Sequence, residues 1–407
     1  MDEVIAQLTA VLAKAAIEVT KLGRDKLSIA STSYPLQPPF SSVTREDWVT
    51  SVRLWLTHGP QLLAELPNRP CPACGCTSER NLFESYDGYP FAECNECRSW
   101  FVPKRVDMTL FNNFFVRCPE SRQLAEKMLQ GRSAAASEQA DRGRIVAYLD
   151  ELVEIAGDNV LKPRYLDTGC GVGNSLIAAL DRGIEAVGVD TDEIAVSIAR
   201  ARGYDVRHTS EALPDGLFDF ISFWESLEHI SDPLEALKRY SPLLRPRGLI
   251  ALTVPNLNSS LVRVMRGDCP YVNGGTTSPG HINLFSLPGL HRLLAQAGLS
   301  LIDADVQYSN NPIDLFAYLF GQSRGATDML ADSDSMSIPF PDIAMKVLNS
   351  IWPAVNMIER ILLTGPILKI TACRKGAESL FEQAVGSLQD RRRKEVIAQA
   401  QEILRYQ

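Results

Sequence analysis

Three glycines at alternate positions form the stretch of the sequence best suited to holding a nucleoside-containing ligand. They are Gly169, Gly171 and Gly173, within the segment YLDTGCGVGN at 165–174. An apolar run precedes them and a helical pattern follows, which predicts a strand, a tight turn and a helix start. In α/β sheets such a turn holds an adenosine cofactor. The next apolar run ends at Asp190, whose carboxylate can accept both ribose hydroxyls.

Two residues near this turn bear on which adenosine cofactor it binds. A dinucleotide site favours glycine or alanine at the sixth position of the motif, where this chain has Asn174. Asp167 lies two residues before the first glycine, where a carboxylate suits a cationic ligand better than a pyrophosphate. S-adenosylmethionine carries an ammonium and a sulfonium and no phosphate. It is therefore favoured, and on this turn alone NAD remains the alternative.

Three later segments follow the glycine turn in a recognisable order. Residues 203–233 contain a strand pattern, 218–223, followed by Glu225, Glu228 and His229, and RPRGLIALTVPNLNS and HINLFSLPGLHRLLAQAGL begin at Arg245 and His281. Together these four motifs resemble the class I S-adenosylmethionine-dependent methyltransferases related to the ubiquinone-biosynthesis O-methyltransferases. The resemblance covers about residues 145–375. It implies an α/β fold with a Rossmann-like seven-stranded methyltransferase sheet and argues against a dinucleotide enzyme.

The resemblance also implies a role for each part of the cofactor site. The backbone of the glycine turn would approach the methionine and ribose, and Asp167 would hold the amino-acid part directly or through water. Asp190 would take the ribose hydroxyls, Ser210 and Glu211 the adenine edge, and Phe223 and Trp224 would wall the methyl group. The complete expected set is Asp167, Gly169, Cys170, Gly171, Gly173, Asn174, Asp190, Ser210, Glu211, Phe223, Trp224 and Glu225.

Two histidines are the candidate bases, because an oxygen acceptor must lose its proton during methylation whereas a neutral amine chiefly needs positioning. His281 ends a Gly/Pro-rich loop, 267–280, that should border the acceptor pocket, and it is placed slightly ahead of His229. Glu225, Glu228 and His229 have the spacing of one helix face. In relatives such an acidic cluster has been implicated in binding a divalent cation, which the resemblance extends to the acceptor site here. The alternative, a structural role for Glu228 and His229 at a helix cap, stays open.

Two CxxC pairs have the ligand spacing of a zinc ribbon. Cys71 and Cys74 form the first pair and Cys94 and Cys97 the second, with 19 residues between the pairs. Four thiolates suit zinc best, although iron can occupy a similar site. Cys76 breaks the symmetry of the pairs and is interpreted as a non-ligand. We expect a closed structural site, and a module that presents substrate or reads RNA remains the alternative.

The totals restrict the class of protein. The chain has 407 residues and nine cysteines, with 45% hydrophobic and 22% charged residues. Its net charge of −8 argues against a broad hold on nucleic acid. No amino-terminal signal pattern or membrane-spanning stretch is evident, so a cytoplasmic protein is expected.

The order of patterns divides the chain into five parts. A helical segment covers 1–66, with an amphipathic helix over about 1–27, a Pro/Ser-rich linker at 31–42 and a helix near 45–66. The zinc ribbon occupies 67–104 and a helical connection 105–157. The methyltransferase domain covers 158–375, with its first strand opening near Val160 and a helical insertion at about 309–365. A C-terminal helix occupies 376–407, and the terminal helices could pair within the chain or form a homodimer.

These patterns predict transfer of a methyl group from S-adenosylmethionine to a small-molecule, saccharide or lipid-linked acceptor, with O-methylation favoured. The insertion would act as a cap and lid over that acceptor, and peripheral contact with a membrane is a further alternative. Sugar C-methylation and N-methylation stay open. Alternatives of another class are an RNA methyltransferase and a non-catalytic scaffold that binds the cofactor.

Overall fold

A computed structural model gives the architecture of most of the chain. It describes residues 32–35, 45–133, 135–157, 162–269, 271–307, 337–340, 355, 359–360 and 362–405. The expected amphipathic helix at 1–27 and nearly all of the insertion at 309–365 lie outside these residues. Among the described helices, none is long and apolar enough to cross a bilayer.

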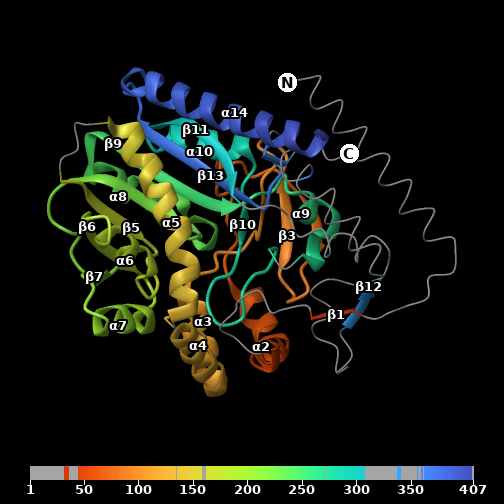
Figure 1. Cartoon of the computed structure of the whole chain (residues 1–407). Coiled ribbons are helices and arrows are strands. Elements are labelled where there is room, and N and C mark those ends of the chain that lie inside the picture. The colour runs from red at the N-terminus through yellow and green to blue at the C-terminus, as the bar shows by residue number, and fades with distance from the viewer. Residues whose placement is uncertain are drawn as a thin grey trace, which may run out of the picture.

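The centre of the molecule is one seven-stranded sheet (Figure 1). Its strands, in spatial order, are β11 (Leu299–Gln307), β13 (Ile367–Arg374), β9 (Leu244–Pro255), β8 (Phe218–Trp224), β5 (Arg164–Thr168), β6 (Glu185–Asp190) and β7 (Val206–His208). The five strands from β9 to β7 run parallel, and β13 is antiparallel to both of its neighbours. A central parallel strand is buried on both faces, which is why β8 reads as the nearly continuous apolar run FDFISFW. The α/β, Rossmann-like sheet expected from the sequence is therefore present.

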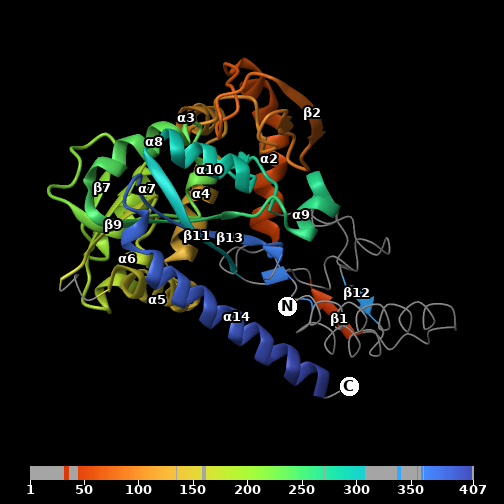
Figure 2. The same cartoon turned by 90° about the horizontal axis from the view of Figure 1, so that it is seen from above.

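Helices cover both faces of this sheet (Figure 2). One face packs against α5 (Ala135–Ala156), α6 (Asn174–Leu180), α7 (Glu193–Ala201) and α14 (Glu382–Arg405). The opposite face packs against α8 (Pro233–Tyr240) and α10 (Leu287–Gln296). Polar caps set where several of these helices begin: Asp192 accepts the first free N–H groups of α7, Asp232 caps α8 and Ser286 caps α10.

The segment expected to form a zinc ribbon makes a second, four-stranded antiparallel sheet with a strand from the expected methyltransferase domain. Its order is β10 (Asn283–Leu284), β4 (Trp100–Phe101), β3 (Pro90–Cys94) and β2 (Glu79–Glu84). A helical layer of α2 (Arg45–Glu65), α3 (Met108–Arg117) and α4 (Pro119–Arg132) lies beside it. Trp55 of α2 stacks on Tyr89 and contacts Phe114, so the ribbon and these helices share one core. The ribbon is built into the body of the protein.

Several local expectations were wrong. The first sheet strand begins at Arg164, because the preceding Pro163 has no N–H to donate to a ladder. Part of the expected linker, Thr32–Pro35, forms strand β1, which pairs antiparallel with β12 (Ser337–Phe340) inside the expected helical insertion. The segment after Glu225 contains only a 3₁₀ turn, η2 (Leu227–His229), before α8. The long carboxy-terminal helix is present, beginning at Glu382 after the short turn η5 (Glu378–Leu380).

Candidate functional site

The glycine turn between β5 and α6 has the backbone its sequence predicts. Gly169, Gly171 and Gly173 all have positive φ angles, of 81°, 53° and 89°, which favour glycine. A Cβ on Gly169 would lie 2.5 Å from the Cβ of Ser226, so this glycine is needed for close packing. A Cβ on Gly171 would meet nothing within 4 Å. The open space at Gly171 is where the turn can receive a ligand.

Asp190 lies directly beside this open space. Its carboxylate accepts the N–H of Gly171 at 2.7 Å and the N–H of Asp192 at 2.8 Å. Burial raises the pKa of this carboxyl group, while the two backbone donors act against that shift. A carboxylate has about four acceptor positions, so lone pairs remain for the hydroxyls of a ribose. The geometry fits the predicted ribose contact.

Asp167 has both of its carboxylate oxygens engaged within the protein. The Ser222 hydroxyl donates to one oxygen at 2.5 Å and the Ser175 hydroxyl donates to the other. The side chain is 1% exposed, and burial raises its pKa to about 6. A contact with the amino-acid part of the cofactor would therefore run through these hydroxyls or through water, which is the indirect form of the prediction.

Two other residues of the turn have side chains that serve the fold. Cys170 is buried, and its Sγ fills the space that a side chain on Gly188 would need. Asn174 donates to the carbonyl of Arg132 at 3.2 Å and accepts from Arg202 at 3.0 Å. Asn174 thereby links the end of α4 to the start of α6.

Phe223 and Trp224 were expected to wall the methyl group. Phe223 is fully buried and packs edge-on against Tyr240, because strand alternation turns its side chain toward α8. Trp224 is partly exposed and lies 5.8 Å from Tyr148, centroid to centroid. The contact of each residue with the cofactor stays a prediction.

The expected adenine-edge residues lie in a shallow surface recess at the end of β7. Ser210 bonds to His208 at 2.6 Å, and Glu211 accepts two bonds from Arg200, at 2.8 and 2.9 Å. The same recess is lined by α7. The ion pair with Arg200 occupies the Glu211 carboxylate, whereas the backbone after β7 is tied to Asp190 through the Thr209 N–H.

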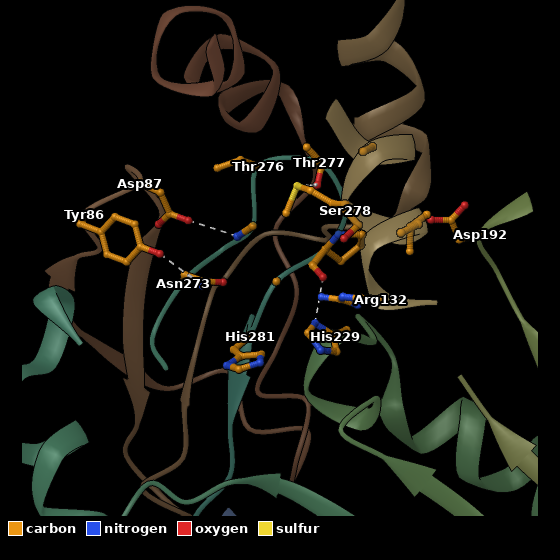
Figure 3. A pocket seen from close by; sticks show the side chains of 16 residues that line it. Tyr86, Asp87, Arg132, Asp192, His229, Asn273, Thr276, Thr277, Ser278 and His281 are labelled. Carbon is orange, nitrogen blue, oxygen red and sulfur yellow. Dashed lines mark hydrogen bonds between the residues drawn. The ribbon is translucent and has the colours of Figure 1, made fainter. Parts of the chain in front are cut away.

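A second cavity, beside the two histidines expected to serve the acceptor, encloses about 90 Å³. The tip of the β2–β3 hairpin, α4 and the loop Gly267–Gly280, here called the glycine-rich loop, line it. Figure 3 shows Tyr86 and Asp87 on one side, Arg132 on the other, and His229 with His281 below them. The cavity thus contains both histidines that the sequence singled out.

Glu228 and the two histidines converge beside this cavity. Nε2 of His229 lies 3.8 Å and Nε2 of His281 lies 4.0 Å from Oε1 of Glu228. Each Nδ1 faces a backbone carbonyl, Pro279 O at 2.8 Å for His229 and Tyr271 O at 2.9 Å for His281. A carbonyl can only accept, so Nδ1 carries the proton and each Nε2 keeps its lone pair. Glu228 is 0% exposed, and neither of its carboxylate oxygens has a hydrogen-bond partner among the residues that the structure describes.

Burial sets the protonation of this cluster. It lowers the pKa of His229 to about 3, with His281 adding to the shift, and lowers the pKa of His281 to about 4. Both imidazoles are therefore neutral near pH 7. Burial also raises the pKa of Glu228 well above its ordinary value. The arrangement offers two neutral bases and a carboxyl group held out of water.

Glu225 does not join this cluster, so the expectation of one shared helix face was wrong. The residue has a φ of 47°, and its backbone N–H bonds to Thr253. Its carboxylate lies 3.5 Å from the Arg144 guanidinium. Glu228 and His229 sit on a 3₁₀ turn, and His281 takes the third place from the glycine-rich loop.

The four predicted cysteine ligands meet at one point. Sγ of Cys71 lies 3.5 Å from Sγ of Cys97, and Cys74 and Cys94 are also 3.5 Å apart. All four sulfur atoms lie within 4.8 Å of one another. A zinc ion with Zn–S bonds of about 2.3 Å needs sulfur atoms about 3.8 Å apart, so the set fits a tetrahedral ion.

The two cysteine pairs have the same local shape. Gly75 and Arg98 each stand four residues after the first cysteine of a pair, have positive φ angles, and donate their N–H to that cysteine's carbonyl. Cys76 lies outside the cluster, and its sulfur accepts the N–H of Ser78 instead. This placement agrees with its interpretation as a non-ligand.

Sequence reasoning missed the residues that the ribbon and α4 bring to the cavity. These are Tyr86 and Asp87 from the hairpin, Arg132 from α4, and Asp192 and Asn273 from loops. The Asp87–Gly88 pair signals a tight turn between two strands. Nothing in its local pattern indicates what that turn touches.

Comparison with known proteins agrees with this fold and turn. Residues 139–304 match the family model described as a methyltransferase domain. The segment contains the glycine turn, Asp190, Glu228, His229 and His281. Residues 139–304 therefore match a methyltransferase domain, and they contain most of the Rossmann-like sheet.

Relatives and solved structures carry similar descriptions. The chain is 32% identical over 123 residues to a ubiquinone biosynthesis O-methyltransferase of Pseudomonas entomophila, covering 28% of this chain and 51% of that protein. A protein of the same name from Pseudomonas paraeruginosa is 31% identical over 124 residues, with the same coverage. The chain thus spans about half the length of the curated relatives it matches. A SAM-dependent methyltransferase structure from Archaeoglobus fulgidus aligns at 19% identity and a TM-score of 0.38, covering 58% of this chain and 94% of that one.

Proposed function

We propose that the protein transfers a methyl group from S-adenosylmethionine to a hydroxyl oxygen of a small-molecule, saccharide or lipid-linked biosynthetic acceptor. The observation that carries this proposal is the pair of neutral imidazoles, His229 and His281, whose unprotonated Nε2 atoms face one buried carboxyl group beside a cavity. A hydroxyl needs such a base to lose its proton as it attacks.

The protein's own contribution is alignment and proton removal. The cofactor supplies the electrophilic methyl group, so the acceptor oxygen has to be held in line with it. The open turn at Gly171 and the carboxylate of Asp190 would hold the cofactor on one side of the site. His281 would remove the acceptor's proton at Nε2, and His229 is the second candidate for this step.

The lining of the cavity supports a hydroxylated acceptor. Thr276, Thr277, Ser278 and Asn273 contribute polar groups, while Met128 and Leu129 provide an apolar side. Sites of this type combine an apolar wall with a few placed polar groups that fix orientation. A saccharide or another polyhydroxylated intermediate suits this mixture, and lipid linkage would require a part of the acceptor to extend outside the cavity.

Glu228, His229 and His281 could together hold a divalent cation at the acceptor site. Two imidazole Nε2 atoms and one carboxylate oxygen form a donor set used for first-row metals, and the Nδ1 bonds to carbonyls supply the supporting contacts of metal-binding histidines. The two orphaned oxygens of Glu228 fit a positive ligand. The Nε2 atoms lie 3.8 and 4.0 Å from Oε1 of Glu228, whereas ligand atoms around a bound ion lie roughly 3 Å apart. The three side chains would therefore move closer together around an ion.

The four-cysteine cluster would hold a structural zinc ion. All four protein ligands are present, which leaves no open position for chemistry. Zinc would fold the segment that supplies Tyr86 and Asp87 to the cavity.

The decisive test is methyl transfer from isotopically labelled S-adenosylmethionine to a panel of hydroxylated, amine and ketosugar acceptors, with and without added Mg²⁺ or Mn²⁺. Mass spectrometry of the product assigns the methylated atom. O-methylation is expected. A C- or N-methylated product would show that the acceptor atom is not oxygen, and the protein would still be a methyltransferase. Transfer to RNA alone, or cofactor binding without any transfer, would overturn the proposal.

A further inference from the structure

The tip of the zinc-ribbon hairpin is hydrogen-bonded to the glycine-rich loop. Asp87 at this tip is 0% exposed, and one carboxylate oxygen accepts the N–H of Gly274 at 3.0 Å and that of Gly275 at 3.1 Å. The other oxygen accepts the Ser85 hydroxyl at 2.5 Å. Burial raises the pKa of this carboxyl group to about 7, and the hydrogen bonds from Ser85, Gly274 and Gly275 act against that shift. A ribbon side chain is therefore bonded to the loop where it turns (Figure 3).

Tyr89 makes the second contact between the hairpin and the loop. Its hydroxyl donates to the carbonyl of Gly275 at 2.8 Å, and its ring stacks on Trp55 at 5.1 Å. A Cβ on Gly274 would lie 2.0 Å from the Tyr89 ring, and Gly275 has a φ of 81°. The loop follows the surface of the ribbon closely, because glycine is needed at both contact positions.

The other side of the loop holds the two histidines. Pro279 and Tyr271 contribute the carbonyls that accept from Nδ1 of His229 and of His281. The Gly280 N–H donates to the Gly274 carbonyl at 2.9 Å, which ties the two sides of the loop together. The segment fixed by Asp87 is thus the segment that fixes the histidine tautomers.

A separate set of hydrogen bonds joins the ribbon to the two segments that carry these histidines. Arg69, two residues before Cys71, donates to the Ser231 carbonyl at 2.6 Å and to Oδ1 of Asn283 at 2.7 Å. Asn283 in turn donates to the carbonyl of Ile230 at 2.8 Å. Ser231 and Asn283 each follow a candidate histidine by two residues. The ribbon therefore borders both histidine-bearing segments.

We propose that the zinc ribbon is part of the acceptor site and that Asp87 is a positioning residue for His229 and His281. By holding the glycine-rich loop, Asp87 keeps two carbonyls on the Nδ1 atoms and so leaves both Nε2 atoms bare toward Glu228. This inference rests on the proposed function for its catalytic meaning. Its structural content, a link from a ribbon carboxylate to two histidine tautomers, stands independently of any acceptor.

The experiment compares Asp87→Asn and Tyr89→Phe with the control Glu84→Gln on the full-length, zinc-loaded protein. Asparagine keeps the shape of the side chain but replaces one acceptor oxygen with a donor. Phenylalanine keeps the stack on Trp55 and removes only the bond to Gly275. Glu84 lies exposed on the same hairpin.

Two readouts need no acceptor. In Asp87→Asn, the amides of Gly274 and Gly275 should exchange with solvent about tenfold faster or more. Nitrogen-15 spectra at pH 7 should show Nδ1–H tautomers of His229 and His281 in the wild type and mixed tautomers in Asp87→Asn. Tyr89→Phe should shift both readouts in the same direction, and Glu84→Gln should change neither. Affinity for S-adenosylmethionine should stay within about twofold of the wild type in all three variants, because Asp87 lies on the acceptor side.

Unchanged tautomers together with unchanged loop exchange in Asp87→Asn would overturn the inference. If that variant does not fold, unchanged readouts in Tyr89→Phe would overturn it equally. With an active acceptor, Asp87→Asn should lower kcat while KM for S-adenosylmethionine stays constant. If Asp87→Asn loses the Nδ1–H tautomers but the wild-type protein methylates no acceptor, the proposed function fails and the positioning role stays intact.

Discussion

The imidazole rings of His229 and His281 lie 5.0 Å apart, centroid to centroid, at an angle of 54°. They come from different segments, η2 and the end of the glycine-rich loop, and their Nε2 atoms face the same oxygen of Glu228. Two bases at one carboxyl group give the site an internal comparison, because each histidine can be removed while the other remains.

Replacing His281 with glutamine should lower kcat for a hydroxyl acceptor about a hundredfold or more, since an unassisted hydroxyl is a poor nucleophile. His229→Gln should have the smaller effect. Cofactor affinity measured by calorimetry should change little in either variant. His291→Gln, on the exposed side of α10, is the matched control and should retain full activity. Equal activity in wild type and His281→Gln would remove this residue from catalysis.

Glu228 should make the metal-free protein less stable as the pH rises. Burial raises its folded pKa above the unfolded value of about 4.3, so the folded state binds more protons between these two values. Stability from this group is present below about pH 4 and is lost as the pH rises toward the folded pKa. The free energy of unfolding, measured with urea, should fall between pH 5 and pH 8 in the wild type. In Glu228→Gln this fall should be smaller by about 1 to 3 kcal/mol. A divalent cation should restore the wild type at pH 8, and identical pH profiles for both proteins would contradict the placement of Glu228.

Two glycines of the β5–α6 turn should respond differently to the same substitution. Both would be strained as alanine because their φ angles are positive, at a cost of about 1 to 2 kcal/mol each. Gly169→Ala adds a clash with Ser226 and should melt at the lower temperature. Gly171→Ala places its methyl group in open space and should mainly weaken S-adenosylmethionine binding, by about tenfold or more. Wild-type cofactor affinity in Gly171→Ala would mean that the cofactor does not cross the turn there.

Metal analysis of the purified protein should give about one zinc per chain. Cys94→Ser should lose that zinc and melt at a lower temperature, because the ribbon core depends on the ion. Cys76→Ser is the control, since the Cys76 sulfur lies outside the cluster, and it should keep both zinc and stability. Zinc retained in Cys94→Ser but lost in Cys76→Ser would reassign the ligand set.

The sheet and the cysteine cluster could be predicted because their patterns are local. The apolar run of β8 is buried on both faces, and each CxxC pair encodes its own turn. The prediction of a helix starting near Glu225 was wrong. It followed the spacing of Glu225, Glu228 and His229, whereas the helix start is marked by the cap Asp232 and by Pro233, where α8 begins.

The acceptor side was only partly predictable because long-range contacts build it. The motif and loop of His281 pointed to this cavity, which His281 does line, whereas Asp87 reaches the loop across 187 positions of sequence. Strand β10 has two residues, too short for any alternation to be seen. Contacts of this kind depend on how the ribbon packs against the rest of the protein, and the local sequence pattern does not encode that packing.

The pairing of β4 with β10 also has a consequence for the order of folding. Ser99 and Ser286 bond to each other across 187 positions of sequence, at the place where the two strands meet. During synthesis the cysteine pairs emerge first and can capture their ion early, but their sheet lacks its edge strand until residues 283–284 have left the ribosome. Closing so long a loop is slow compared with local turn formation. A nascent chain should therefore pass through a state in which the ribbon is metallated while its edge is still unpaired.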